Sequence, residues 1–179
     1  MWLAGRRNEP ATVGDVLVLC RAHGAAAMEQ QHLGETVLVG NIPGVEMGGG
    51  WAFRTRSNLV PTPPALQDAG LTTDMVCWPV RRGDFLGGVT QAPARVGRAP
   101  SNEIALAHQD VSKLHARVWQ RGEQLALEDA RSLNGTYING IRLPLGGRGT
   151  ALPGDTVAFG PVALRVMNVQ RLMVLLATL

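Results

Sequence analysis

Four polar side chains, placed in three short segments, supply the donors in this sequence that could do chemistry. Arg98 stands in the first segment, Ser112 and Lys113 stand together in the second, and Asn134 stands in the third. A guanidinium can meet two oxygens of a phosphate, and a hydroxyl and an ammonium add further donors. An amide offers both a donor and an acceptor, as an extended peptide backbone requires. These residue types suit the binding of a phosphate dianion, which needs several donors held in place.

Neither catalysis nor a metal site is indicated by the titratable residues. His115 is not accompanied by a serine or cysteine nucleophile with an oriented base, so we expect a structural role for it and no enzymatic activity. The other histidines show no ligand spacing with it, and we expect neither metal nor cofactor; they are His23, His32 and His108. Cys20 and Cys77 are isolated, and we expect two buried, reduced thiols.

The segments between the polar residues have the pattern of β-strands. Apolar residues alternate with polar ones over 103–106, 116–119 and 124–128, and turns rich in Gly and Asn divide these stretches. Further strands are expected at 75–80, 141–144, 156–160 and 162–167, with a Pro-Gly turn at 152–155. Period-two alternation of this kind predicts an antiparallel β-domain that carries the polar residues on its loops.

Four motifs in fixed order make the sequence resemble the forkhead-associated (FHA) domain family. They are Val96-Gly97-Arg98, Ser112-Lys113-Leu114-His115, Ser132-Leu133-Asn134-Gly135-Thr136 and Asn139-Gly140. The resemblance covers residues 75–169. It implies a mainly β protein with an FHA-like antiparallel β-sandwich, preceded by an α+β extension.

The resemblance also implies a binding function and assigns residues to it. The family binds phosphothreonine peptides through loops at one end of the sandwich. Arg98, Ser112, Lys113 and Asn134 match its ligand-contacting positions. The residues implied to support the site structurally are Gly97, His115, Gly135, Asn139 and Gly140. Asn139-Gly140 also has the composition of a tight hairpin turn.

One residue departs from the family pattern. The position before Asn134 usually carries threonine or serine, whose hydroxyl can reach the phosphate, but in this sequence it is Leu133. A hydrogen bond to a charged group contributes about 1.5–3 kcal/mol, so its loss weakens binding roughly tenfold to a hundredfold. The alternative is that a backbone N–H replaces the hydroxyl.

Residues 1–56 are expected to form an α+β region of unknown role. A helix is predicted over 11–31, with Thr12 as N-cap and Asp15 in a capping box, and its apolar stripe should dock on a sheet. Strands are expected at 35–40 and 51–55, and the Gly48–Gly50 triplet between them is interpreted as a flexible turn. The proline-containing segment 57–74 is expected to be a linker, and 170–179 a tail of undecided helical or extended structure.

Composition narrows the class of partner. A net charge of +3 from dispersed residues does not predict nucleic-acid binding. The N-terminus lacks the apolar core of a signal peptide, and the apolar run 172–177 is far shorter than the roughly 20 residues that span a bilayer. We expect a cytoplasmic protein without a membrane partner, and the arginine-, glycine- and alanine-rich composition indicates a bacterial source.

Two functional hypotheses follow. The first is a signalling adaptor that binds a phosphothreonine-containing protein or peptide, and the second is a structural or assembly protein that uses the FHA fold without phosphate. An enzyme within residues 1–74 is disfavoured, because we find no paired carboxylates, nucleophile motif or metal cluster there. As a subsidiary idea, a phosphorylated Thr62, Thr72 or Thr73 could enter the site of another chain, which would give self-association.

Overall fold

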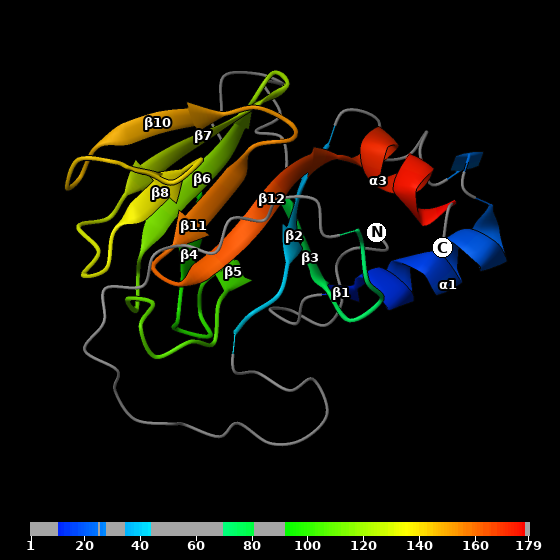
Figure 1. Cartoon of the computed structure of the whole chain (residues 1–179), viewed down its shortest axis with the longest axis horizontal. Coiled ribbons are helices and arrows are strands. Elements are labelled where there is room, and N and C mark those ends of the chain that lie inside the picture. The colour runs from blue at the N-terminus through cyan, green and yellow to red at the C-terminus, as the bar shows by residue number, and fades with distance from the viewer. Residues whose placement is uncertain (1–10, 25, 28–34, 44–69, 81–91, 178–179) are drawn as a thin grey trace.

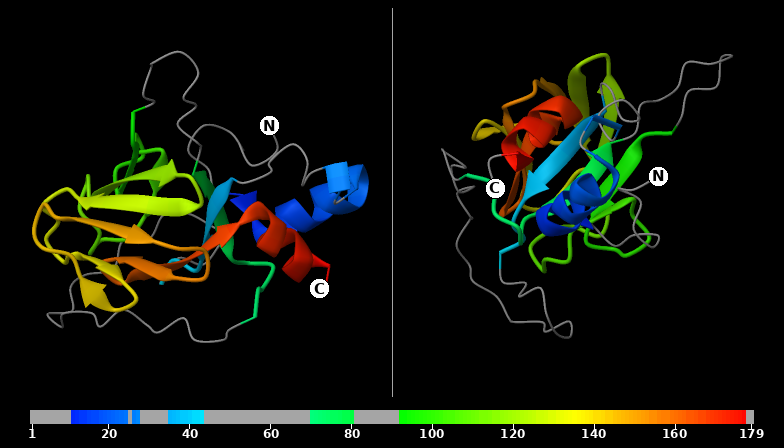
Figure 2. Two further views of the ribbon diagram at one scale, coloured as in Figure 1. Left: turned by 90° about the horizontal axis from the view of Figure 1, so that it is seen from above. Right: turned by 90° about the vertical axis from the view of Figure 1, so that its right-hand side faces the viewer.

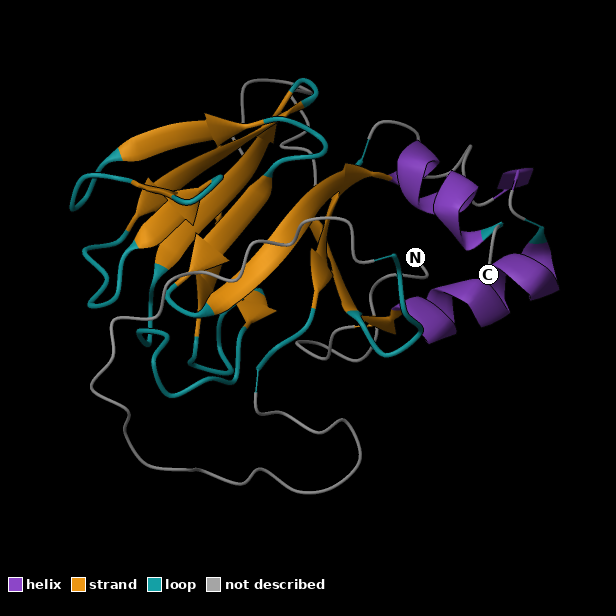
Figure 3. Ribbon diagram, viewed as in Figure 1, coloured by secondary structure: helices purple, strands orange, loops and turns teal. Residues whose placement is uncertain are grey.

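The computed structural model describes residues 11–24, 26–27, 35–43, 70–80 and 92–177. These residues form two β-sheets packed face to face and a layer of helices outside the larger sheet (Figures 1 and 3). The architecture is mainly β, as the alternation predicted. The larger sheet has seven strands and the smaller has five.

The two sheets draw their strands from distant parts of the chain. In spatial order, the larger sheet contains β1 (Ala11–Thr12), β3 (Val76–Val80), β2 (Thr36–Gly40), β12 (Val162–Asn168), β11 (Thr156–Phe159), β8 (Thr136–Ile138) and β9 (Ile141–Arg142). In the same way, the smaller sheet contains β10 (Arg148–Ala151), β7 (Gln124–Asp129), β6 (Ala116–Arg121), β4 (Ala94–Gly97) and β5 (Ile104–Ala105). Neighbouring strands are antiparallel, except that β4 and β5 are parallel.

The inner faces of the two sheets share one apolar core. Alternate residues of β6, among them Ala116 and Val118, point inward and are fully buried. They meet inward-facing residues of the larger sheet, including Phe159 and Leu164. Since successive side chains of a strand point to opposite faces, this alternation is what the packing of one sheet on another requires.

A second apolar cluster lies on the outer face of the larger sheet. Helices α1 (Val13–His23) and α3 (Val169–Leu176) gather on this side of the molecule, away from β8 and β9 (Figures 1 and 2). Their buried side chains pack against residues of β2, β3 and β12 that point away from the sandwich core; these strand residues are Val37, Val39, Cys77 and Met167. Strand β2 is therefore buried on both faces.

Helix α1 begins as its sequence predicts and ends earlier. The Thr12 hydroxyl accepts a hydrogen bond from the Asp15 N–H at 3.0 Å, and the Asp15 carboxylate accepts one from the Thr12 N–H at 2.9 Å. The helix docks on the sheet, as expected. The continuous helix predicted over 11–31 is wrong, because α1 stops at His23 and Gly24 takes a φ of +84°, which ends a helix.

Strand β2 shows how the N-terminal region meets the rest of the chain. It pairs with β3 and β12, which come from the far side of the expected linker at 57–74. Residues on both sides of that segment therefore share one sheet and one core. The role of residues 1–56 as a region of their own stays a prediction.

Most of the predicted strands are present, and one strand was not predicted. The strands predicted at 35–40, 75–80, 141–144, 156–160 and 162–167 are present, and the undecided C-terminal segment contains helix α3, capped by Asn168. Strand β10 was missed, because only Ala151 of its residues is buried and no apolar alternation marks it. The expected turn at Gly48–Gly50, the strand at 51–55, His32 and Thr62 lie outside the described residues.

No helix in the described part of the chain is long and apolar enough to cross a membrane.

Candidate functional site

Three loops meet at one end of the sandwich. One follows β4, one precedes β6 and one connects β7 to β8. Because β4 and β7 both run antiparallel to β6, all three loops lie at the same end of these strands. The Arg98 N–H donates to the Ser112 carbonyl at 2.9 Å, and the Ala99 N–H donates to the Lys113 carbonyl at 3.2 Å. The Leu133 N–H reaches Ser112 from the third loop. The four predicted contact residues are thereby brought to one place.

The first two loops approach each other closely because of Gly97. A methyl group built on this glycine would overlap the Lys113 carbonyl oxygen and would lie 2.9 Å from Asn102 Nδ2. The buried Asn102 amide itself donates to the Lys113 carbonyl at 2.7 Å. Sequence reasoning missed Asn102, because an asparagine in a turn gives no sign of a bond that spans eleven residues.

The side chain of Arg98 is held in place through its Nε. Its Nε donates to the Val111 carbonyl at 3.1 Å, while the side chain is exposed. Within the described residues its two terminal nitrogens make no hydrogen bond or ion pair. Arg95, by contrast, is paired with Glu103 at 2.9 Å. Arg98 therefore keeps the N–H groups of both terminal nitrogens, which suit a phosphate.

Ser112 and Lys113 contribute a hydroxyl and a positive charge. The Ser112 Oγ accepts the Leu133 N–H at 3.1 Å, and this bond leaves the hydroxyl proton to be donated elsewhere. Lys113 is exposed, and its ammonium forms no ion pair with any residue in the described ranges. Leu133 itself is 84% exposed.

Asn134 is fixed from two sides. Its Nδ2 donates to the Asp110 carbonyl at 2.7 Å, and its own carbonyl accepts the Tyr137 hydroxyl at 3.0 Å. The amide oxygen makes no bond within the described part of the chain. It can accept an N–H from an extended ligand backbone.

His115 lies beneath the loops and joins two of them. It is fully buried, its Nδ1 accepts the Ser112 N–H at 3.1 Å, and its Nε2 lies 3.0 Å from the Gly135 carbonyl. Because Nδ1 is an acceptor, Nε2 carries the proton, and the ring is neutral. Burial lowers the pKa of His115, against smaller opposing effects from the Gly135 carbonyl and Asp129. This arrangement is that of a brace.

Asp129 organises the third loop, and sequence reasoning did not identify it. Its carboxylate accepts the Ser132 hydroxyl at 2.5 Å, the Thr136 hydroxyl at 2.8 Å, and the N–H groups of Ser132 and Gly146. Burial would raise its pKa, but these hydrogen bonds lower it overall. The carboxylate therefore remains charged and ties residues 132–136 to the loop after β9.

The supporting residues sit at turns and close contacts. Gly135 has a φ of +83°, and its carbonyl also accepts the Gly160 N–H at 2.9 Å. Asn139 and Gly140, with φ of 49° and 79°, form the two-residue turn between β8 and β9. The Asn139 amide accepts the Thr156 N–H and donates to Asp155, which fixes this turn to β11.

The thiols and possible metal ligands lie apart from this site. Cys20 and Cys77 are buried and free, as predicted. Burial raises the pKa of Cys77 to about 12, with a smaller effect from Asp15, so this thiol is not reactive at neutral pH. The described residues contain no group of histidine, cysteine and acidic side chains that could hold a metal ion.

A β-sandwich with donors gathered on the loops at one end has the layout of a binding domain, and comparison with known families identifies it. Residues 94–160 match the family model described as FHA domain, and the chain therefore carries a domain of this family. The resemblance of the four motifs is confirmed.

Curated proteins are similar to part of this chain. The oxoglutarate dehydrogenase inhibitor of Corynebacterium jeikeium is 38% identical over 63 residues, which are 34% of this chain and 44% of that protein. The ABC transporter ATP-binding/permease protein Rv1747 of Mycobacterium tuberculosis is 32% identical over 87 residues, 48% of this chain and 10% of that protein. The chain thus spans less than half the length of these curated relatives.

A solved structure from a structural and functional analysis of phosphothreonine-dependent FHA domain interactions is also similar. It has a TM-score of 0.42 at 22% identity, and the match covers 51% of this chain and 82% of that one.

Proposed function

We propose that this chain is a phosphothreonine-dependent binding module, a cytoplasmic adaptor without catalysis of its own. The FHA family to which its domain belongs binds phosphothreonine peptides through the loops at one end of the sandwich. The proposal assigns the phosphate to Arg98, Ser112 and Lys113 and the ligand backbone to Asn134.

The observation that carries the proposal is that hydrogen bonds within the chain join the three loops and hold the proposed contact side chains. Arg98 is bonded to Val111, Ser112 to Leu133 and Asn134 to Asp110. Each bond fixes a side chain or loop and leaves other donors or acceptors of the same side chain able to contact a ligand. Little ordering is then needed on binding, which is the condition under which a few polar contacts give useful affinity.

Leu133 sets the expected strength of binding. Its side chain carries no hydroxyl for the phosphate, and its N–H is already engaged by Ser112 Oγ. We propose that this N–H, which Ser112 Oγ already engages, does not replace the missing hydroxyl. The proposed affinity for phosphopeptide is therefore lower than that of a domain with threonine at this position.

An oriented phosphothreonine peptide library, followed by titration of single peptides, tests the proposal. We expect the phosphorylated peptides to bind and their unphosphorylated forms not to bind, with loss of binding in Arg98→Ala. Arg121→Ala is the matched control, because Arg121 is an exposed arginine at the opposite end of β6. Binding that is indifferent to phosphate and to Arg98→Ala would instead support the phosphate-independent assembly protein.

Self-association through a phosphorylated threonine stays a prediction. Thr72 and Thr73 are exposed, as a modifiable residue must be. Mass spectrometry of the protein from its native host decides the matter, since unmodified threonines would remove the basis of the idea.

A further inference from the structure

Two exposed arginines beside the proposed site are left without a role by the phosphate contacts. Arg131 lies in the β7–β8 loop, and Arg142 is the last residue of β9. Neither side chain forms an ion pair or hydrogen bond with another residue of the described ranges, whereas Arg117 and Arg148 both pair with Glu128. Arg98 and Lys113 already supply positive charge to a phosphate, so these two cations are additional.

Arg142 is placed by packing. A methyl group built on Gly135 would overlap its Nε and would lie 3.0 Å from Cζ and 3.1 Å from an Nη atom. The guanidinium therefore lies on the backbone of Gly135, the residue after Asn134. It lies next to Asn134, the proposed peptide contact, and its N–H groups make no hydrogen bond to another described residue.

Arg131 occupies a backbone conformation that favours glycine. Its φ is 60°, in the left-handed region that is unfavourable for any side chain with a Cβ. Its side chain lies against Gly146, with Cγ and Nε 3.8 and 3.9 Å from the position of a methyl group there. Non-glycine residues in this conformation cluster at functional sites, so we take Arg131 as a candidate contact residue.

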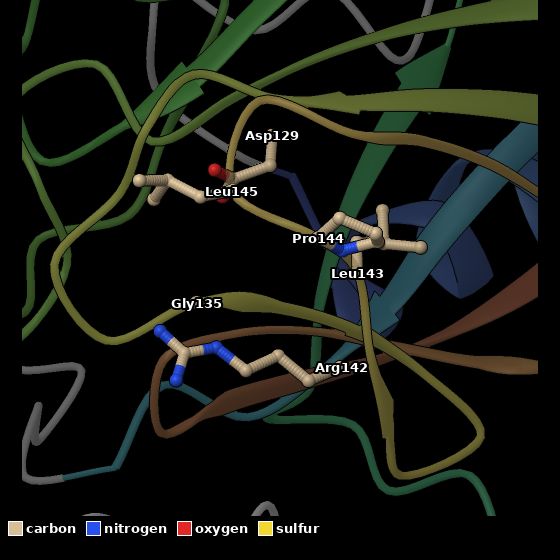
Figure 4. A pocket seen from close by; sticks show the side chains of 6 residues that line it. All are labelled: Asp129, Gly135, Arg142, Leu143, Pro144 and Leu145. Carbon is tan, nitrogen blue, oxygen red and sulfur yellow. The ribbon is translucent and has the colours of Figure 1, made fainter.

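Arg142 is one of the residues that line a pocket of about 350 Å³ (Figure 4). Arg142 and Gly135 line one part of it, and the apolar side chains of Leu143, Pro144 and Leu145 line another. Arg131 is not one of the lining residues, but its side chain lies against Gly146, which follows the lining residue Leu145 in the chain.

The one acidic residue among the pocket's lining residues is already engaged. The oxygens of Asp129 are occupied by the four bonds from Ser132, Thr136 and Gly146, and this residue is only 2% exposed. Arg131 and Arg142 thus carry positive charge that no described acidic side chain pairs with, whereas the carboxylate of Asp129 is fully hydrogen-bonded. The pocket walls beside Arg142 are partly apolar.

We propose that Arg131 and Arg142 form a second anion-binding subsite, which takes an acidic side chain of the bound phosphothreonine peptide. This inference rests on the proposed function. Glutamate fits the pocket best by its chemistry, because its methylene groups can contact Leu143, Pro144 and Leu145 while its carboxylate meets the arginines. Guanidinium and carboxylate pair through two parallel hydrogen bonds, which gives a geometric preference as well as charge attraction.

A glutamate scan of a phosphothreonine peptide tests the subsite with the full chain. A single Glu is moved along the positions before and after the phosphothreonine, with Gln at the same position as the uncharged control. We expect one position at which Glu binds about three- to tenfold more tightly than Gln. Arg142→Gln and Arg131→Gly should each reduce this preference, and both together should abolish it, with little change for the Gln peptide.

The variants are chosen so that folding does not decide the result. Arg131→Gly places glycine where the backbone favours it, and Arg121→Gln serves as a control arginine at the opposite end of the sandwich. A Glu preference that survives in the double variant would overturn the subsite. So would phosphate-dependent binding, sensitive to Arg98→Ala, that shows no preference for Glu at any position. Absence of all phosphate-dependent binding would overturn the proposed function, and the subsite with it.

Discussion

The side chains assigned to the ligand are each held by one hydrogen bond that leaves their other donors or acceptors open. Arg98 is bonded through Nε, Ser112 through the acceptor side of its hydroxyl, and Asn134 through its Nδ2. At the scale of single residues, hydrogen bonds within the chain thus hold the proposed contact residues in place. The exception is Leu133, which presents a methyl-bearing surface where a hydroxyl would add a phosphate contact.

Leu133→Thr is expected to strengthen phosphopeptide binding about tenfold. A threonine hydroxyl at this position can donate to the phosphate, and a hydrogen bond to a charged group is worth about 1.5 kcal/mol or more. Titration of one phosphothreonine peptide by calorimetry measures the change. Leu133→Val is the control, because it has nearly the shape of threonine but no hydroxyl. An equal gain in both variants would show that the leucine acts through its bulk.

His115 predicts how stability changes with pH. Burial lowers its pKa below the ordinary value of about 6.5, so the unfolded chain binds a proton more readily than the folded chain. The free energy of unfolding should therefore fall as pH drops below about 6.5, by up to about 1.4 kcal/mol per pH unit for this residue, and be insensitive to it above. Urea unfolding between neutral and mildly acidic pH measures the slope.

A variant separates His115 from the second affected histidine. Burial also lowers the pKa of His108. His115→Gln should remove the contribution of His115 to the pH dependence of the free energy of unfolding, whatever its effect on stability at neutral pH. His108→Gln should remove the contribution of His108 in the same way. A slope unchanged in His115→Gln would contradict the assignment of a neutral, buried ring.

At the scale of elements, the end of β4 and the loop before β6 depend on Gly97. We expect Gly97→Ala to destabilise the fold by about 1–3 kcal/mol, because its methyl group would overlap the Lys113 carbonyl and crowd Asn102. Phosphopeptide affinity should fall as well, since the same displacement moves Ser112 and Lys113. Gly70→Ala is the control, because no atom lies near the added methyl group there. Normal affinity in Gly97→Ala would show that the loops adapt.

The sequence predicts the strands and the loop signatures because each depends on residues close together in the chain. Alternation in β6 and β7 and the Asn139-Gly140 turn are local patterns, and so is the capping box of α1. An acidic residue at a strand end is ordinarily exposed, so the sequence did not indicate that Asp129 is buried. The hydrogen bonds of Asp129 are also not local, because one of its partners, Gly146, lies seventeen residues away. The same holds for Arg142, whose place against Gly135 follows from the pairing of β8 with β9.

At the scale of the whole molecule, the larger sheet joins two apolar cores. Leu38 of β2 points into the sandwich, while its neighbours Val37 and Val39 point toward the helices. The helical segments 13–23 and 169–176 therefore pack on strands that also close the sandwich core, and the segment 36–40 is one of these strands. A sheet shared in this way couples the helical layer to the FHA domain in folding, even though the binding loops belong to the opposite part of the molecule.

Leu172→Ala tests this coupling. Leu172 of α3 is fully buried against the sheet, so its truncation should destabilise the chain by about 2–5 kcal/mol. If the helices and the sandwich fold together, urea unfolding should show one transition, shifted to lower urea, whether followed by far-ultraviolet circular dichroism or by tryptophan fluorescence. Val174→Ala on the same helix, at a residue 62% exposed, should change the free energy of unfolding by less than about 0.5 kcal/mol. Phosphopeptide affinity of the folded Leu172→Ala protein should equal that of the parent, because Leu172 packs in the second apolar cluster, which contains none of the proposed contact residues. An early separate transition of the helices would show instead that the sandwich stands without them.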